Sequence, residues 1–155
     1  QVNFAGAVPN RYETCFGWEQ AHAAQVNFAG AVPNRYETCF GCGRLRDDGL
    51  RIHPGRVSDG LVACVWHPRG RVAEEWVWAA LDCTSGWAWP IGDISLVTGR
   101  LTGGLLESEP IDPVGPYIAV GAQLTSHGRK HISAAALFTP AGHRVAGVQA
   151  TWLLV

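Results

Sequence analysis

The chain has 155 residues, with 12 lysines and arginines and 13 aspartates and glutamates, so its formal net charge is -1. This length can bury the core of one domain, and no apolar stretch is long enough to cross a membrane. The lack of a lysine and arginine stripe argues against nucleic acid as a partner. Five cysteines without framework-like spacing, together with a start unlike a signal peptide, predict a cytoplasmic protein.

The chain opens with two identical segments, but they do not have the pattern of a repeat fold. Residues 1–17 and 25–41 carry the same letters, QVNFAGAVPNRYETCFG. Solenoid repeats keep a pattern while their letters drift, and they need about three units to bury a core. We therefore interpret the perfect copy as a recent duplication or an artefact, with residues 1–24 surplus and residues 25–155 forming a single domain. A chain that begins at Gln25 is expected to melt at the same temperature as the full chain.

The first regular element expected after the repeat is a strand that ends at His67. Alternation places Val62, Cys64 and Trp66 on one buried face of this strand. A helix is predicted over residues 73–89, the only long apolar helix candidate in the chain.

The rest of the chain alternates as strands joined by turns. Strands are expected over residues 94–106, 117–126, 132–138 and 146–154, with a proline-rich connection over 107–116. The faces expected to be buried in the second and third of these strands carry Ile118, Val120, Ala122 and Leu124, then Ile132, Ala134, Ala136 and Phe138. One long helix packed on a curved antiparallel sheet would bury both elements, so the predicted fold class is α+β.

Asp82 lies in the middle of the predicted apolar helix and requires an explanation. Ionised carboxylates are rarely buried without a partner, so Asp82 either makes a structural hydrogen bond or takes part in chemistry. Arg100, on the polar face of the following strand, is the alternative structural partner. At helical spacing Asp82 shares a stripe with Glu75, Trp78, Ser85 and Trp89.

Two segments resemble the hotdog-fold thioesterases. Residues 34–43, NRYETCFGCG, and residues 48–52, DGLRI, are similar to the Cys-Phe-x-Cys-Gly leader and Gly-Leu-Arg strand entry of one branch. Residues 80–88, ALDCTSGWA, are similar to the central helix of that family. The resemblance covers about residues 34–155. It implies a curved sheet wrapped around one helix, assembly as a homodimer or homotetramer, and an acyl thioester such as acyl-CoA as substrate, with no cofactor.

The resemblance also implies roles for particular residues. Asp82 matches the helix carboxylate that attacks the thioester carbonyl or activates water, and Ser85 or Thr84 would position it. The expected contacts with substrate are Glu75, Trp78, Trp89, Arg100, Arg129 and Lys130. The last two lie in a basic hairpin that could contact the phosphates of coenzyme A, although such hairpins are more often simply solvated.

The start of the predicted helix departs from the family pattern. The family places His-Gly-Gly there, so that glycine amides polarise the carbonyl, whereas residues 73–75 are Ala-Glu-Glu. Acidic residues in a first turn also complement the helix dipole. The leading prediction is therefore an acyl thioester hydrolase that uses Asp82, and the alternative is a non-catalytic acyl-ligand binding protein. A dehydratase ranks third, because no histidine is visibly paired with a helix acid.

The Cys39-x-x-Cys42 pair raises the possibility of a metal or redox site. A structural zinc ion needs four ligands, and neither a second Cys-x-x-Cys nor a spaced histidine pair follows, so no metal is expected. We interpret the pair as part of a glycine-rich leader held against the sheet. Cys64 and Cys83 are expected to be small core residues.

Overall fold

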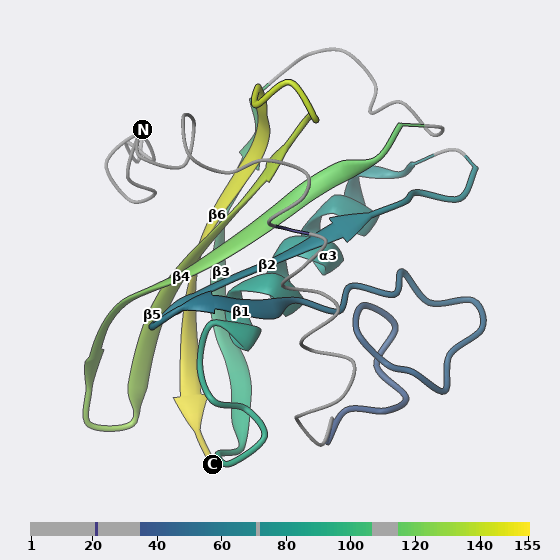
Figure 1. Ribbon diagram of the computed structural model, residues 1–155. Coiled ribbons are helices and arrows are strands. Elements are labelled where there is room, and N and C mark those ends of the chain that lie inside the picture. The colour runs from purple at the N-terminus through teal and green to yellow at the C-terminus, as the bar shows by residue number, and fades with distance from the viewer. Residues whose placement is uncertain (1–20, 22–34, 71, 107–114) are drawn as a thin grey trace.

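The computed structural model describes residue 21 and residues 35–70, 72–106 and 115–155 (Figure 1). The first copy of the repeat and most of the proline-rich connection lie outside these residues. The elements described are β1 Gly55–Ser58, β2 Leu61–Trp66, α3 Glu74–Trp87, β3 Leu96–Leu105, β4 Tyr117–His127, β5 Lys130–Phe138 and β6 Arg144–Leu154. No helix among the described residues is long and apolar enough to span a bilayer.

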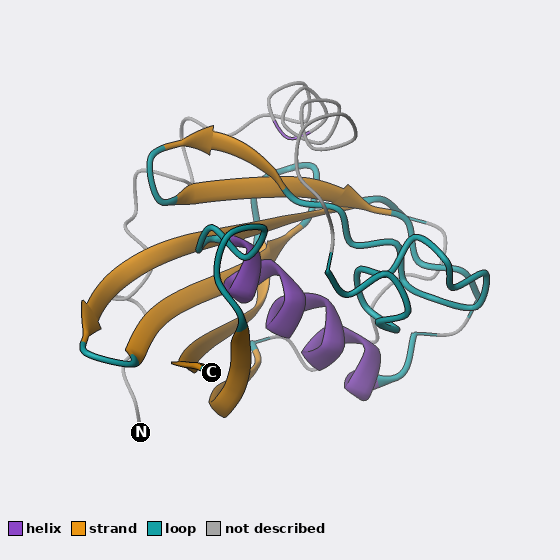
Figure 2. Cartoon of the chain, turned by 90° about the horizontal axis from the view of Figure 1, so that it is seen from below, coloured by secondary structure: helices purple, strands orange, loops and turns teal. Residues whose placement is uncertain are grey.

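The strands form one antiparallel sheet in the order β1-β2-β4-β5-β6-β3. The sheet curves around α3, which lies along its concave side (Figure 2). Strand β3 follows the helix in sequence but pairs with β6 at the far edge of the sheet. The predicted arrangement of one helix on a curved antiparallel sheet is therefore confirmed.

Helix α3 begins at Glu74 and ends at Trp87, so it is shorter than the helix predicted over residues 73–89. Two acidic residues occupy its first turn, as the dipole favours. At the other end the Trp89 amide bonds back to the carbonyl of Gly86, and Pro90 cannot continue the helix. Trp89 consequently lies beyond the helix and is not part of the stripe that contains Asp82.

The helix packs directly on the sheet. Its buried residues Val77, Ala80 and Leu81 belong to the main core cluster. At Gly121 of β4 a side-chain carbon would overlap the Thr84 carbonyl, so only glycine permits this approach. The position of α3 along the sheet is fixed by that contact.

The central strands are buried on both faces over residues 117–122 of β4 and 133–138 of β5, whereas the sequence predicted one buried face each, and Leu124, expected in the core, is 39% exposed. In β4 and β5 the residues expected to form the core face away from the helix, and Tyr117, Ala119, Ala135 and Leu137 face it instead. Small apolar residues on both sides of a strand make its alternation ambiguous. The cluster on the outer face comprises Ala21, Ala63, Val65, Ile118, Val120, Ala134, Ala136 and Phe138.

Ala21 belongs to the segment that the sequence analysis considered surplus, yet it is fully buried on this outer face. It lies after the repeated letters, which end at residue 17. We therefore expect a chain beginning at Trp18 to melt at the temperature of the full chain, and a chain beginning at Gln25 to melt lower because the outer face loses cover. Differential scanning calorimetry of the three chains checks this. Equal melting temperatures for all three would instead support the dispensability of the whole 1–24 segment.

Candidate functional site

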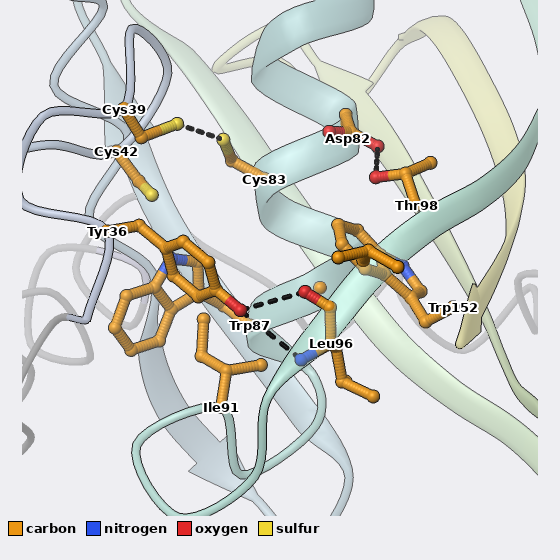
Figure 3. A pocket seen from close by; sticks show the side chains of 12 residues that line it. Tyr36, Cys39, Cys42, Asp82, Cys83, Trp87, Ile91, Leu96, Thr98 and Trp152 are labelled. Atoms are coloured by element: carbon orange, nitrogen blue, oxygen red, sulfur yellow. Dashed lines mark hydrogen bonds between the residues drawn. The ribbon is translucent and has the colours of Figure 1, made fainter. Parts of the chain in front are cut away.

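A cavity of about 240 Å³ lies between the leader, the second half of α3 and the start of β3 (Figure 3). Its surface is mainly apolar, with contributions from Trp87, Ile91 and Leu96. The side chains that carry chemistry at this cavity are Cys39, Cys42, Asp82, Cys83 and Thr98. A carboxylate and a hydroxyl beside an apolar hollow can orient a small ligand and react with it.

The leader that closes one side of the cavity is the second copy of the repeated letters. The Tyr36 hydroxyl donates to the Leu96 carbonyl at 2.8 Å and accepts from the Leu96 amide at 3.3 Å. Arg35 donates to the Gly92 carbonyl and to the Ser95 hydroxyl. These bonds hold the leader on the loop before β3, as expected of the copy that continues into the domain.

Asp82 is held by a residue that the sequence analysis did not select. The Thr98 hydroxyl donates to Oδ1 of Asp82 at 2.9 Å (Figure 3). Burial raises the pKa of the Asp82 carboxyl, the hydrogen bond from Thr98 lowers it, and the charge at Cys39 raises it. The net direction is upward, so the carboxylate is a stronger base than an exposed aspartate.

The alternative structural partner, Arg100, does not contact Asp82 by a hydrogen bond or an ion pair. Its Nε donates to the Thr102 hydroxyl at 3.2 Å on the exposed side of β3. The cause is a bulge: Thr98 pairs with Trp152 and Arg100 with Thr151, which leaves Gly99 as an extra residue. Thr98 and Arg100 therefore lie on opposite faces of β3, although strict alternation would place them on the same face.

The hydroxyls of Thr84 and Ser85, which were predicted to position the Asp82 carboxylate, donate to backbone carbonyls instead. Thr84 and Ser85 are fully buried. The Thr84 hydroxyl donates to the Ala80 carbonyl at 2.7 Å. The Ser85 hydroxyl donates to the Asp82 carbonyl at 2.8 Å and accepts from the Trp152 indole at 3.1 Å. Neither residue lines the cavity, and their predicted roles are untested proposals with less geometric support than Thr98.

The residues predicted to contact substrate also lie outside the cavity lining. Glu75 is exposed, and the Trp78 indole donates to Glu74 at 3.2 Å. Trp89 is buried with its ring edge-on to His131, at 4.7 Å between centroids. The hairpin is exposed, and there the Arg129 side chain donates to the Leu154 carbonyl.

Lys130 is exposed on the same hairpin. Of the predicted site residues, the structure therefore brings Asp82 alone to the cavity within the part of the chain that it describes.

Three thiols form a cluster on the leader side of the cavity. The sulfur atoms of Cys39, Cys42 and Cys83 all lie within 4.8 Å of one another, and those of Cys39 and Cys83 are 3.7 Å apart. Hydrogen bonds from the other two thiols lower the pKa of Cys39, and the same contacts raise the pKa values of Cys42 and Cys83. Cys83 packs against the core as expected and also belongs to this group of thiols, and Cys64 is fully buried as expected.

No protein-family model matches the chain, and no curated protein is similar to it. Solved structures do match. A thioesterase superfamily protein is 22% identical, with a TM-score of 0.56 over 64% of this chain and 52% of that one, so this chain spans about half the length of that protein.

Two streptococcal structures match over 66% of this chain. A hypothetical thioesterase protein from Streptococcus pneumoniae TIGR4, solved with coenzyme A, is 12% identical with a TM-score of 0.58 over 84% of its length. A Streptococcus mutans UA159 protein bound to acetyl CoA is 13% identical with a TM-score of 0.57 over 86% of its length. Together with the curved sheet around one helix, these matches show that the chain has the hotdog fold found in thioesterase superfamily proteins.

The pneumococcal protein has also been solved as two single alanine variants. One replaces an aspartate, and the other replaces a threonine sixteen residues later in that protein. Asp82 and Thr98 are separated by 16 residues in this chain.

Proposed function

We propose that the protein hydrolyses an acyl thioester of the acyl-CoA type, with Asp82 as the catalytic carboxylate. The observation that carries this proposal is the hydrogen bond from Thr98 to Asp82 at the rim of a mainly apolar cavity. The structures of similar fold with coenzyme A and acetyl CoA support the ligand class. The aspartate and the threonine replaced in the pneumococcal protein are 16 residues apart, as Asp82 and Thr98 are here, which supports a joint role for Asp82 and Thr98.

The proposed chemistry follows from how Asp82 is held. Because Thr98 bonds to Oδ1, Oδ2 is left to accept a proton from water. The water oxygen bonds to the thioester carbonyl carbon while its proton passes to Asp82. The carbon–sulfur bond then breaks, and the leaving sulfur takes the proton as a thiol. Direct attack by Oδ2 would give an acyl-carboxylate intermediate that water hydrolyses to the same products.

The developing oxyanion needs donors, and the start of α3 offers backbone amides. Ala73 provides no side-chain cap, so the first amides of the helix remain available. The Glu74 carboxylate accepts from Trp78 along the helix. Eight residues separate Glu74 from Asp82, a rise of about 12 Å, which is too far for one carbonyl group to contact both. We propose that a second copy of the chain supplies the helix start.

The exposed edge of the sheet suits such an assembly. Strand β3 is ten residues long and lies at the end of the strand order, with Val97 45% exposed. Long unpaired edges favour pairing with another chain. We expect light scattering to give the mass of a homodimer or homotetramer. A monomer mass at every concentration would contradict the two-chain site but not the catalytic role of Asp82.

Replacement of the catalytic carboxylate tests the proposal directly. Asp82→Asn keeps the shape and accepts the Thr98 hydrogen bond but cannot take up a proton. We expect acyl-CoA turnover, followed by free thiol release, to fall by about a hundredfold or more with little change in ligand affinity. Asp93→Asn, at an exposed carboxylate just after the helix, is the matched control and should retain turnover. Equal turnover in the Asp82 variant would exclude the mechanism.

The hydrogen bond to Asp82 has its own test. Thr98→Val preserves the shape of the side chain and removes the donor, so we expect kcat/KM to fall by about tenfold as the carboxylate loses its orientation. Thr102→Val removes a hydroxyl that accepts from Arg100 on the exposed face of β3, and it should leave kcat/KM unchanged. Equal effects of the two substitutions would show that Thr98 does not position Asp82.

A non-catalytic acyl-ligand binding protein is the second candidate, because Glu74 and Glu75 replace the glycines expected at the helix start. The same measurements separate the two functions. A binder would show saturable acyl-CoA binding without thiol release, and Asp82→Asn would lower the free energy of unfolding by about 1 to 3 kcal/mol instead of affecting turnover. A dehydratase has less support, since no histidine lines the cavity in the described residues.

A further inference from the structure

We propose that Cys39, Cys42 and Cys83 bind a zinc ion at the edge of the cavity and thereby join the leader to α3. The sequence analysis expected no metal, because it found only the two leader thiols. The fold supplies a third thiol from the helix, 44 residues after Cys39. Three convergent thiols are a ligand set that favours a thiophilic metal such as zinc.

The spacing of the sulfur atoms fits such an ion. All three lie within 4.8 Å of one another, and the Cys39 and Cys83 sulfurs are 3.7 Å apart. Two sulfurs bound to one tetrahedral zinc at about 2.3 Å would be separated by about 3.8 Å. The thiols therefore need only small side-chain adjustments to share an ion.

The leader turn is shaped to bring its two thiols to the helix. The Gly43 amide donates to the Cys39 carbonyl at 2.8 Å, which closes the turn. A side chain at Gly43 would overlap the Cys39 and Glu37 carbonyls, and one at Gly41 would overlap the Cys83 sulfur. Both glycines are thus required for the approach of Cys39 and Cys42 to Cys83.

The fourth coordination position would face the cavity, because all three cysteines line it. A water molecule can fill this position in the resting protein. Asp82 is adjacent to Cys83 in sequence, but its side chain points to the other side of the helix, toward Thr98 (Figure 3). The zinc site and the proposed catalytic carboxylate are therefore separate, and the zinc site has its own function of fastening the leader.

Metal analysis of the full chain tests this proposal. The protein is purified without chelator, incubated with zinc and freed of excess metal, and its zinc content per chain is then measured by inductively coupled plasma mass spectrometry. We expect about one zinc per chain in the wild type and well under one in Cys39→Ala and Cys83→Ala. Cys64→Ala, which changes a buried thiol outside the cluster, should retain about one zinc. Asp82→Asn should also retain it, whatever happens to turnover.

Cobalt provides a second measurement, and its reading on the wild-type protein does not depend on how well a variant folds. Substitution of cobalt for zinc should produce the intense near-ultraviolet absorption of thiolate-to-cobalt charge transfer, and Cys39→Ser, at a partly buried position, should weaken it. Wild-type protein that holds well under one zinc after incubation would overturn the proposal. So would zinc retained in both alanine variants or a Cys39–Cys83 disulfide in freshly purified protein.

Discussion

The close approach of α3 to β4 is the constraint on which the rest of the structure depends. At Gly121 the absence of a side chain lets the Thr84 carbonyl rest against the sheet, and the adjacent Ser85 hydroxyl joins α3 to Trp152 of β6. These contacts set both the height and the rotation of the helix. With the rotation fixed, Asp82 faces the start of β3 and Cys83 faces the leader, so adjacent residues serve two different sides of one cavity.

The sequence was sufficient to predict the class of fold, because helix and strand periodicities differ strongly in this chain. A carboxylate inside an apolar helix is conspicuous, so the sequence also singled out Asp82 as a candidate, and the structure places this residue at the cavity. It misassigned the inner faces of β4 and β5, where alanines and other small apolar residues occupy both sides of each strand. Hydrophobic alternation carries little information when both faces are buried, one by a helix and the other by a cover that includes Ala21.

The remaining site residues could not be predicted because they depend on contacts distant in sequence. Thr98 reaches Asp82 only because of a bulge in β3, and no local pattern distinguishes Gly99 from the other glycines of that strand. Cys83 meets the leader thiols only after the helix is placed on the sheet. The Cys-x-x-Cys-Gly pattern does predict that Cys39 and Cys42 lie close together in a tight turn. It does not predict that Cys83, 44 residues after Cys39, joins them.

The bulge at Gly99 lets two residues of β3 share the inner face although they are three positions apart. Before the bulge Thr98 faces Asp82, and after it Leu101 packs against the core, whereas regular alternation would place these two side chains on opposite faces. If every residue were kept and the pairing with β6 became regular, one end of β3 would shift by one residue, and either Thr98 would leave Asp82 or Leu101 would leave the core. Deletion of Gly99 would instead leave Thr98 opposite Trp152 and Arg100 opposite Thr151, so the strand tolerates loss of the extra residue but not a regular pairing that includes it.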